Sequence, residues 1–374
     1  MKIYSRLRPQ TLMDRQNSRT RVARSPLWIL SCLAALLLAA CGGGSGPGSA
    51  ASATPTEAPV NGFGTAANHV HSLIALPDNV LLLATHYGIF RSSDGGTSWT
   101  QVSSGPNQPM QGLMETSLVS SPLNPQRLYV LTQIAIPHPK GTLGLYTSAD
   151  QGRTWQLTVT TASMGNMFFV AAGNDTPNEA YVYLPALGPL GLKVSLDAGA
   201  HFSPAGQLPF GNIWGMLAIP GSPGNLLIYG SEGVARSTDG GVHWQALKGI
   251  SGGVFDMVMA RAHAPIYAAG DAGMYVSKDN GRSFQLVYTK SSFGSLTASP
   301  VQPDLLYGET GTAIYRSADG GHTWSQLPAI KGNLGNLAAD PTNADLLYLS
   351  LSYPTQVYRY NHSNGEWSSL TPGA

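Results

Sequence analysis

Three histidines lie close together in the sequence, near the start of a repetitive region. His69 and His71 alternate in "HVHSL", as do side chains on one side of a β-strand, and His86 follows in "ATHYG". Imidazole nitrogens are good ligands for zinc and copper, so three of them on one face could form a metal site. Hydrogen-bonded histidines that line a channel are the alternative, and under that interpretation we expect no cofactor.

Acidic and polar side chains form a second group of candidates. Hydrolysis of a glycosidic bond needs two carboxylates about 5–10 Å apart, and Asp256 and Glu115 are the candidates for such a catalytic pair. Other polar residues could bind a cation or sugar hydroxyls: His71, His86, Tyr87, Glu232, Asp271 and Glu309. Ordinary solvated turn residues are the alternative, since turns favour polar side chains.

An eight-residue box of the form S/x/D/x/G/x/x/aromatic recurs through the chain, as in "SSDGGTSW" (92–99) and "SADGGHTW" (317–324). Its aspartates, spaced 56, 47, 42, 40 and 40 residues apart, are Asp94, Asp150, Asp197, Asp239, Asp279 and Asp319. A seventh copy, "YRYNHSNGEW" (358–367), lacks the aspartate. A short carboxylate in a turn can accept backbone N–H groups, and glycine permits positive φ. The pattern therefore predicts structural turns rather than catalysis.

The elements that must position these residues are short strands. An apolar segment such as "HSLIALP" (71–77) and a β-rich pair such as "VLLLATHYGIFRS" (80–92) precede each box, and a fourth segment such as "SWTQVS" (98–103) follows it. A period of about 40 residues with four strands is typical of a propeller blade. We predict an all-β, seven-bladed β-propeller of four-stranded antiparallel blades, with the box turns between strands three and four.

Ligands of a propeller should bind at the mouth of the central channel, where loops from several blades converge. The start of each first strand and the hairpin between strands two and three should share that face. Three blades carry glycine at the start of the first strand, namely Gly215, Gly294 and Gly335. We align His71, Thr116 and Asp256 with these glycines and interpret them as polar residues of the channel mouth.

Charge is distributed unevenly along the 374 residues. Residues 1–40 hold seven Lys or Arg and one acid, which leaves 14 basic and 19 acidic residues in the rest, a net charge of −5. A mildly acidic body disfavours nucleic acid as a partner. The two cysteines, Cys32 and Cys41, both lie near the N-terminus, so the body cannot form a disulfide.

The N-terminal region predicts a targeting signal. The apolar run "LWILSCLAALLLAAC" (27–41) is shorter than the ~20 residues that a membrane-spanning helix needs. It follows a basic segment, as the core of a signal peptide does. We divide the chain into a signal peptide (1–40), a Gly/Ser/Pro-rich tether (41–65) and the propeller (66–374).

The segment "LLAAC" (37–41) resembles the lipobox of bacterial lipoproteins. The resemblance implies cleavage before Cys41, lipidation of Cys41, and anchoring outside the cytoplasm to the cell membrane or outer membrane. An uncleaved anchor helix and a plain secretory signal are the alternatives.

The boxes resemble the Asp-box (BNR) repeat of sialidases, sortilin-type receptors, xyloglucanase-like glycoside hydrolases and photosystem II assembly factors. The similarity covers about residues 69 to 372 and implies that the boxes lie on the outer rim. Sialidases hold their substrate with three arginines. In this chain Arg127, Arg261 and Arg359 are the arginines outside the boxes and the strands before them, and none of them lies in an Arg-Ile-Pro segment like that of sialidases. Xyloglucanase-like enzymes usually place their site between two propellers. We therefore expect a lipid-anchored binding or assembly module for a glycan or protein ligand, with an exo-acting glycosidase as the alternative.

Overall fold

The structure is a computed structural model that describes residues 63 and 68–371. The predicted signal peptide, Cys41 and all of the tether except Phe63 lie outside the described residues. Within the described part, no helix combines the length and the apolar character needed to cross a membrane.

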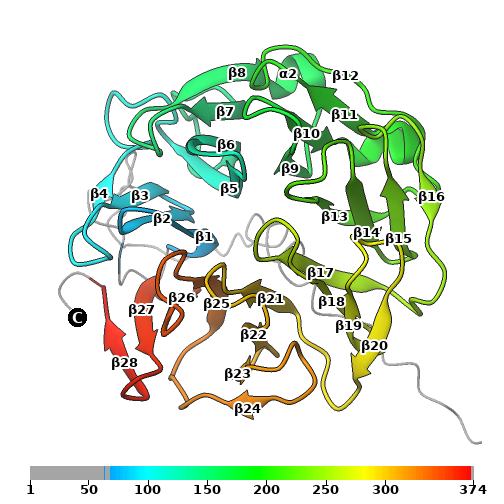
Figure 1. Ribbon diagram of the computed structural model, residues 1–374. Coiled ribbons are helices and arrows are strands. Elements are labelled where there is room, and N and C mark those ends of the chain that lie inside the picture. Colours follow the sequence, from blue (N-terminus) through cyan, green and yellow to red (C-terminus); the bar gives the residue numbers. More distant parts are fainter. Residues whose placement is uncertain (1–62, 64–67, 372–374) are drawn as a thin grey trace, which may run out of the picture. The chain divides into compact units, whose positions relative to one another are not determined.

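The propeller prediction is confirmed. Seven four-stranded antiparallel sheets surround a central axis, with the first strand of each blade innermost (Figure 1). Blades one to four comprise β1 (Val70–Leu76), β2 (Val80–Thr85), β3 (Gly88–Ser92) and β4 (Thr100–Gln101); β5 (Leu113–Ser121), β6 (Asn124–Ile134), β7 (Gly144–Ser148) and β8 (Gln156–Thr160); β9 (Phe169–Ala172), β10 (Ala180–Tyr183), β11 (Leu192–Ser195) and β12 (Ser203–Pro204); β13 (Ile213–Ala218), β14 (Leu226–Gly230), β15 (Gly233–Ser237) and β16 (Gln245–Ala246).

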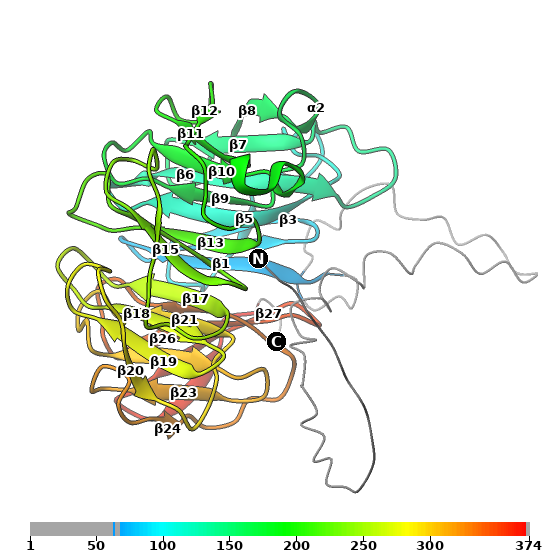
Figure 2. The same cartoon turned by 90° about the vertical axis from the view of Figure 1, so that its right-hand side faces the viewer.

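The remaining three blades follow the same order around the ring, which Figure 2 shows from the side. They comprise β17 (Val254–Met259), β18 (Ile266–Gly270), β19 (Gly273–Ser277) and β20 (Gln285–Tyr288); β21 (Ser295–Ala298), β22 (Leu306–Glu309), β23 (Ile314–Ser317) and β24 (Ser325–Gln326); β25 (Leu334–Ala339), β26 (Leu346–Leu351), β27 (Gln356–Asn361) and β28 (Glu366–Ser369). Two short helical segments, α2 (Thr161–Met164) and η1 (Pro185–Leu190), were not predicted.

The second strands are apolar because both faces of each blade are covered by its neighbours. All six residues of β2 are buried. Leu82 packs with Leu128 of blade two, whereas Leu81 packs with Tyr348 of blade seven. Alternate residues of one strand therefore belong to two different inter-blade cores, and hydrophobic burial holds the ring together.

The ring closes between blades one and seven by packing. All four strands of each blade are consecutive in the chain, and β1 lies beside β25. The Trp99 Nε1–H donates to the carbonyl oxygen of Leu370 at 3.0 Å. The ring of Phe63 packs at this joint between blades one and seven. Its centroid lies 4.9 Å from that of Phe90 and 5.5 Å from that of Trp99.

Each box aspartate lies in the turn between the third and fourth strands of its blade. In blade one, the Ser98 N–H and hydroxyl donate to Asp94 at 2.9 and 2.6 Å. The buried Ser92 hydroxyl donates to the same carboxylate and accepts the Gly96 N–H at 2.8 Å. The hydrogen bonds from Ser98 and Ser92 lower the pKa of Asp94 to about 2. Equivalent bonds surround the other five aspartates: Asp150, Asp197, Asp239, Asp279 and Asp319.

Arginines of the third strands connect the box turns to neighbouring blades. Arg91 Nε donates to the carbonyl of Gln151, in the box of blade two, at 2.9 Å. Arg236 Nε donates in the same way to Asn280, in the box of blade five, at 3.4 Å. These bonds engage backbone carbonyls rather than a ligand.

Candidate functional site

The start of each first strand and the hairpin between strands two and three share one face of the ring, as predicted. In blade one, Val70 pairs with Thr85, and the His86 N–H donates to the carbonyl of His69 at 2.9 Å. In blade five, the Asp271 N–H donates to Gly253 at 3.0 Å. Residues from these two loop sets can therefore meet.

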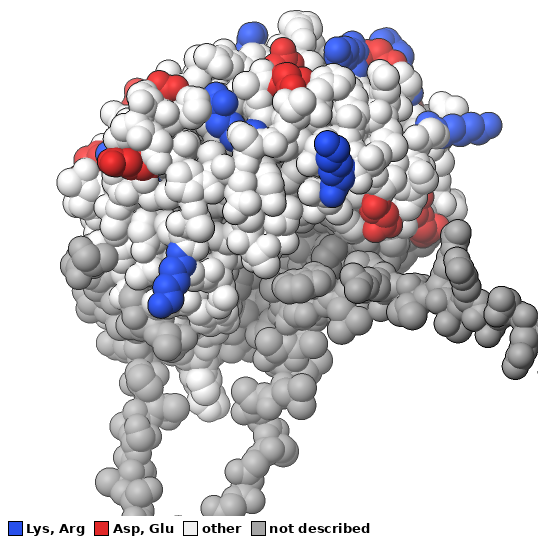
Figure 3. Space-filling model, turned by 90° about the horizontal axis from the view of Figure 1, so that it is seen from below, with Lys and Arg blue, Asp and Glu red and all other residues white. Residues whose placement is uncertain are grey.

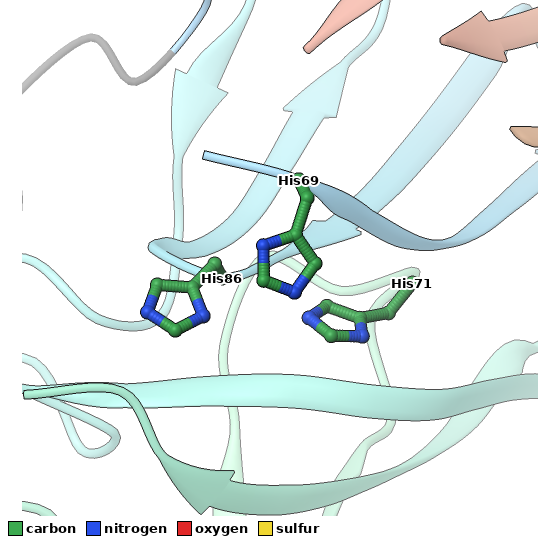
Figure 4. A group of neighbouring side chains, drawn as sticks. All are labelled: His69, His71 and His86. Carbon is green, nitrogen blue, oxygen red and sulfur yellow. The ribbon is translucent and has the colours of Figure 1, made fainter. Parts of the chain in front are cut away.

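The structure brings the three histidines together on this face. The ring of His69 lies between the other two, with its centroid 4.5 Å from that of His71 and 4.8 Å from that of His86 (Figure 4). One ring nitrogen from each histidine lies within 4.8 Å of those of the other two. Among the described residues this is the sole group of three or more potential metal ligands of this kind.

A β-bulge positions His71. Val70 pairs with Thr85 and Ser72 with Ala84, so His71 is the extra residue on β1. Blades four and five have the same bulge, at Trp214 and Phe255. The alignment of His71 with Gly215 and Asp256 was therefore wrong by one residue, since the register places Ser72 at their position.

Neighbouring blades complete the surroundings of the histidines. His86 makes a hydrogen bond with the backbone of Ala135, in the long hairpin of blade two. The ring of Tyr353, in the hairpin that follows β26, stacks on His69 with centroids 5.1 Å apart and an interplanar angle of 28°. The Tyr87 ring packs edge-on against His86 at 5.0 Å. The cluster thus involves blades seven, one and two.

The three imidazoles are held in the neutral form. Burial, together with the nearby His86, lowers the pKa of His69 to about 4. Burial and the other two rings lower the pKa of His71 to about 3, and burial also lowers the pKa of His86. His71 Nε2 and His86 Nδ1 are both buried and have no hydrogen-bond partner. A buried polar atom without a partner costs about 1–3 kcal/mol, so these two nitrogens need an explanation.

Asp256 connects two blades. Its Oδ2 accepts the Leu296 N–H of blade six at 2.8 Å, and its Oδ1 accepts the Met257 N–H at 2.8 Å. Burial raises the pKa of Asp256 to about 6 against the lowering effect of these bonds. The carboxylate therefore supports the contact between first strands of adjacent blades.

Glu115 is fully buried. Its Oε1 lies 2.6 Å from the hydroxyls of both Ser103 and Ser104, while its Oε2 has no partner. Burial raises its pKa to about 8. Glu115 lies in blade two and Asp256 in blade five, so the two predicted catalytic acids come from blades that are not neighbours in the ring.

The acids of the hairpins lie in three different blades. Asp271 Oδ2 accepts the Gly253 N–H at 2.7 Å, within blade five. Glu309 is nearly buried and accepts the Gly311 N–H, and burial raises its pKa. Glu232 is exposed in the turn after β14. Asp271 and Glu309 thus stabilise their own hairpins.

A cavity of about 390 Å³ lies along the innermost strands β5, β9, β13 and β17. Trp214 lines it and stacks on Phe255, with centroids 5.9 Å apart and an interplanar angle of 20°. Sequence reasoning did not identify this cavity, although Trp214 was visible as an aromatic residue at the start of a first strand.

Charged side chains are sparse on the side of the propeller drawn in Figure 3. Lysines, arginines and acids appear there singly or in small mixed groups, and most of the surface is uncharged. This face of the described residues therefore carries no extended patch of one sign.

Comparison with protein families yields no matching family model. Among curated proteins, the chain is 25% identical over 268 residues to the xyloglucanase Xgh74A of Acetivibrio thermocellus. The match covers 56% of this chain but only 32% of the relative, so the chain spans less than two thirds of that enzyme.

Solved structures confirm the fold. The GH74 xyloglucanase of Xanthomonas campestris superposes with a TM-score of 0.64 at 16% identity, over 85% of this chain and 56% of that one. YCF48 of Cyanidioschyzon merolae superposes with a TM-score of 0.58 at 16% identity, over 82% of this chain and 99% of that one. A YCF48 bound to D1 peptide is also similar, with a TM-score of 0.57. At these identities the likeness concerns the propeller fold.

Proposed function

We propose that this protein is a lipid-anchored, extracytoplasmic propeller that binds a glycan or protein ligand at the mouth of its channel. The observation that carries the proposal is the cluster of His69, His71 and His86 of blade one, to which blade seven adds Tyr353 and blade two the backbone of Ala135. Rings at the ends of strands offer flat, partly apolar surfaces and few flexible bonds, as ligand sites do.

The use of the acids supports binding rather than catalysis. Asp256 accepts two backbone N–H groups, and Glu115 is buried between two serine hydroxyls. Because both carboxyls are engaged in contacts within the protein, they are not presented to a ligand as the opposed pair that glycoside hydrolysis requires. The likeness to YCF48 bound to D1 peptide shows that a propeller of this fold can hold a peptide.

Ligand arrays test the binding function. The purified protein is treated with EDTA and applied to glycan and peptide arrays, and each hit is measured by calorimetry. We expect Tyr353→Ala and His69→Ala to weaken binding at least tenfold, while the exposed His322→Ala, in the box turn of blade six, leaves it unchanged. Equal binding by all three variants would refute this site.

Membrane fractionation tests the anchor. We expect the wild-type protein in the detergent phase with a labelled fatty acid, and we expect Cys41→Ser to lose both properties. Cys32→Ser is the matched control, since it lies in the predicted signal peptide. Retention of label by Cys41→Ser would contradict the lipid anchor.

A glycosidase is the second candidate because the sequence and structural comparisons both include xyloglucanases. Turnover of xyloglucan oligosaccharides or an aryl glycoside tests it. Activity that is lost in Asp256→Asn, with an unchanged melting temperature, would favour the enzyme over the binding module.

A further inference from the structure

The three histidines on the propeller face also suggest a site that does not depend on the identity of the ligand. Their rings converge from neighbouring parts of blade one. His69 directly precedes β1, His71 lies in the bulge of β1, and His86 lies in the hairpin after β2 (Figure 4). We propose that His69, His71 and His86 together bind one late first-row transition metal ion, zinc or copper(II).

The hydrogen bonds of His86 leave one of its nitrogens available to a metal. The backbone of Ala135 bonds one ring nitrogen, and this bond raises the pKa of His86, as a carbonyl acceptor does. Since Nδ1 has no partner, we assign the proton and this bond to Nε2. A metal-binding histidine commonly donates its second nitrogen to a carbonyl in this way, which fixes the tautomer and directs the lone pair of the other nitrogen.

His71 provides a second nitrogen that only a further ligand would satisfy. Its Nε2 is buried and without a partner, and the ring of His69 lies beside it. Hydrogen-bonded channel histidines, the alternative to a metal site, would not leave two such atoms. A metal ion bound to both nitrogens removes the cost of burying them unpaired.

The spacing of the nitrogens is close to that of a metal-loaded site. Metal–nitrogen bonds of about 2.0–2.1 Å place tetrahedral ligands roughly 3.4 Å apart. One ring nitrogen of each histidine already lies within 4.8 Å of those of the other two. Small rotations of the rings therefore suffice to close the site without moving the strands.

The chemistry of the ligands selects the metal. Three neutral imidazoles suit zinc and copper, whereas magnesium and calcium require oxygen ligands. Neutral rings need not release a proton to bind. Three histidines leave a fourth position, and the partial exposure of His69 and His86 allows water or an atom of a bound molecule to occupy it.

Metal uptake by the tag-free full chain tests the proposal without any other ligand. The protein is stripped with EDTA, incubated with Zn²⁺ or Cu²⁺ and desalted. The bound metal per protein chain is then measured by inductively coupled plasma mass spectrometry. We expect one equivalent in the wild type and in His322→Ala, and less than 0.2 equivalent in His71→Ala and His86→Ala. Retention below 0.2 equivalent by the wild type, or full retention by His71→Ala, would overturn the site.

Electron paramagnetic resonance of the copper-loaded wild type provides a test that needs no variant. We expect hyperfine splitting from three imidazole nitrogens, and a spectrum with one or none would refute the site. The His71→Gln variant is the folding control. If its circular dichroism spectrum equals that of the wild type, its loss of metal cannot be attributed to unfolding. Failure to bind metal leaves the proposed ligand-binding function standing, since that function is measured on EDTA-treated protein.

Discussion

Glu115 should make the stability of this protein fall as the pH rises. Its carboxyl is completely buried, and burial raises its pKa from the usual 4.5 to about 8. The unfolded chain releases this proton near pH 4.5, while the folded chain keeps it until about pH 8. The stabilising effect is therefore fully present below pH 4.5 and is lost as the pH rises through 8.

The hydrogen bonds around Glu115 fit the protonated form. The Ser104 hydroxyl lies 2.9 Å from the carbonyl of Leu113 and 2.6 Å from Glu115 Oε1, but it has a single proton. If that proton goes to Leu113, the protonated Glu115 donates to Ser104. Ser103 then donates to Glu115 while accepting the Ile89 N–H at 2.7 Å.

The perturbation is Glu115→Gln, which keeps the shape and removes the titration. One pKa unit corresponds to about 1.4 kcal/mol. Relative to the variant, the wild type should lose about 1.4 kcal/mol of unfolding free energy per pH unit between pH 5 and 8, or about 4 kcal/mol in all. Urea unfolding at pH 5, 6, 7 and 8 measures this difference. The exposed Glu366→Gln is the control and should run parallel to the wild type. If the Glu115→Gln curve also runs parallel, the carboxyl is ionised in the fold and the reasoning fails.

Three further predictions concern the cluster, the boxes and the joint. In EDTA, lowering the pH from 7.5 to 4.5 should destabilise the wild type by about 3 kcal/mol more than His71→Gln, because the unfolded chain takes up a proton near pH 6.5 whereas the folded His71 does not until about pH 3; equal losses of unfolding free energy in the two proteins would exclude this. Ser92→Ala should cost about 1–3 kcal/mol in urea unfolding, since the buried Gly96 N–H loses its acceptor, and ligand affinity should not change. Phe63→Ala should cost about 3 kcal/mol because its ring packs in the joint of blades one and seven; an unchanged melting temperature would contradict that packing.

The repeated units made the fold predictable. Each box encloses a complete local network, in which a serine, an aspartate and a glycine N–H bond within a few residues of one another. Such a network needs no distant partner, so the pattern of residue types was sufficient to predict it. The strand-forming segments that precede and follow each box, four in each unit, then predicted the four-stranded blades.

The candidate site was only partly predictable. The hairpin of blade one places His86 opposite His69, and sequence spacing indicated this neighbourhood. The bulge at His71 shifts the register by one residue, and no residue type in a single sequence signals it. Tyr353 was missed because its contact with His69 exists only once blade seven meets blade one, and the closure of the ring could not be predicted.

The burial of Glu115 was also missed. It depends on how the loop after β4, with Ser103 and Ser104, folds against β5. These contacts join segments of two blades, and a carboxylate at the start of a strand looks the same in sequence whether it faces water or a serine hydroxyl. The two short helical segments between strands were not predicted either. In α2, the N-cap is a single hydrogen bond from the Ser163 N–H to the Thr160 side chain, and one such bond is not recognisable in the sequence.

The way in which blade one meets blade seven has a consequence for protein engineering. Because each sheet of the described residues consists of four consecutive strands, a circular permutant that is opened between β16 and β17 and spliced from β28 to β1 would keep these sheets whole. Any of the six connections between consecutive blades could serve as the opening, so reporter domains could be inserted there without dividing a blade.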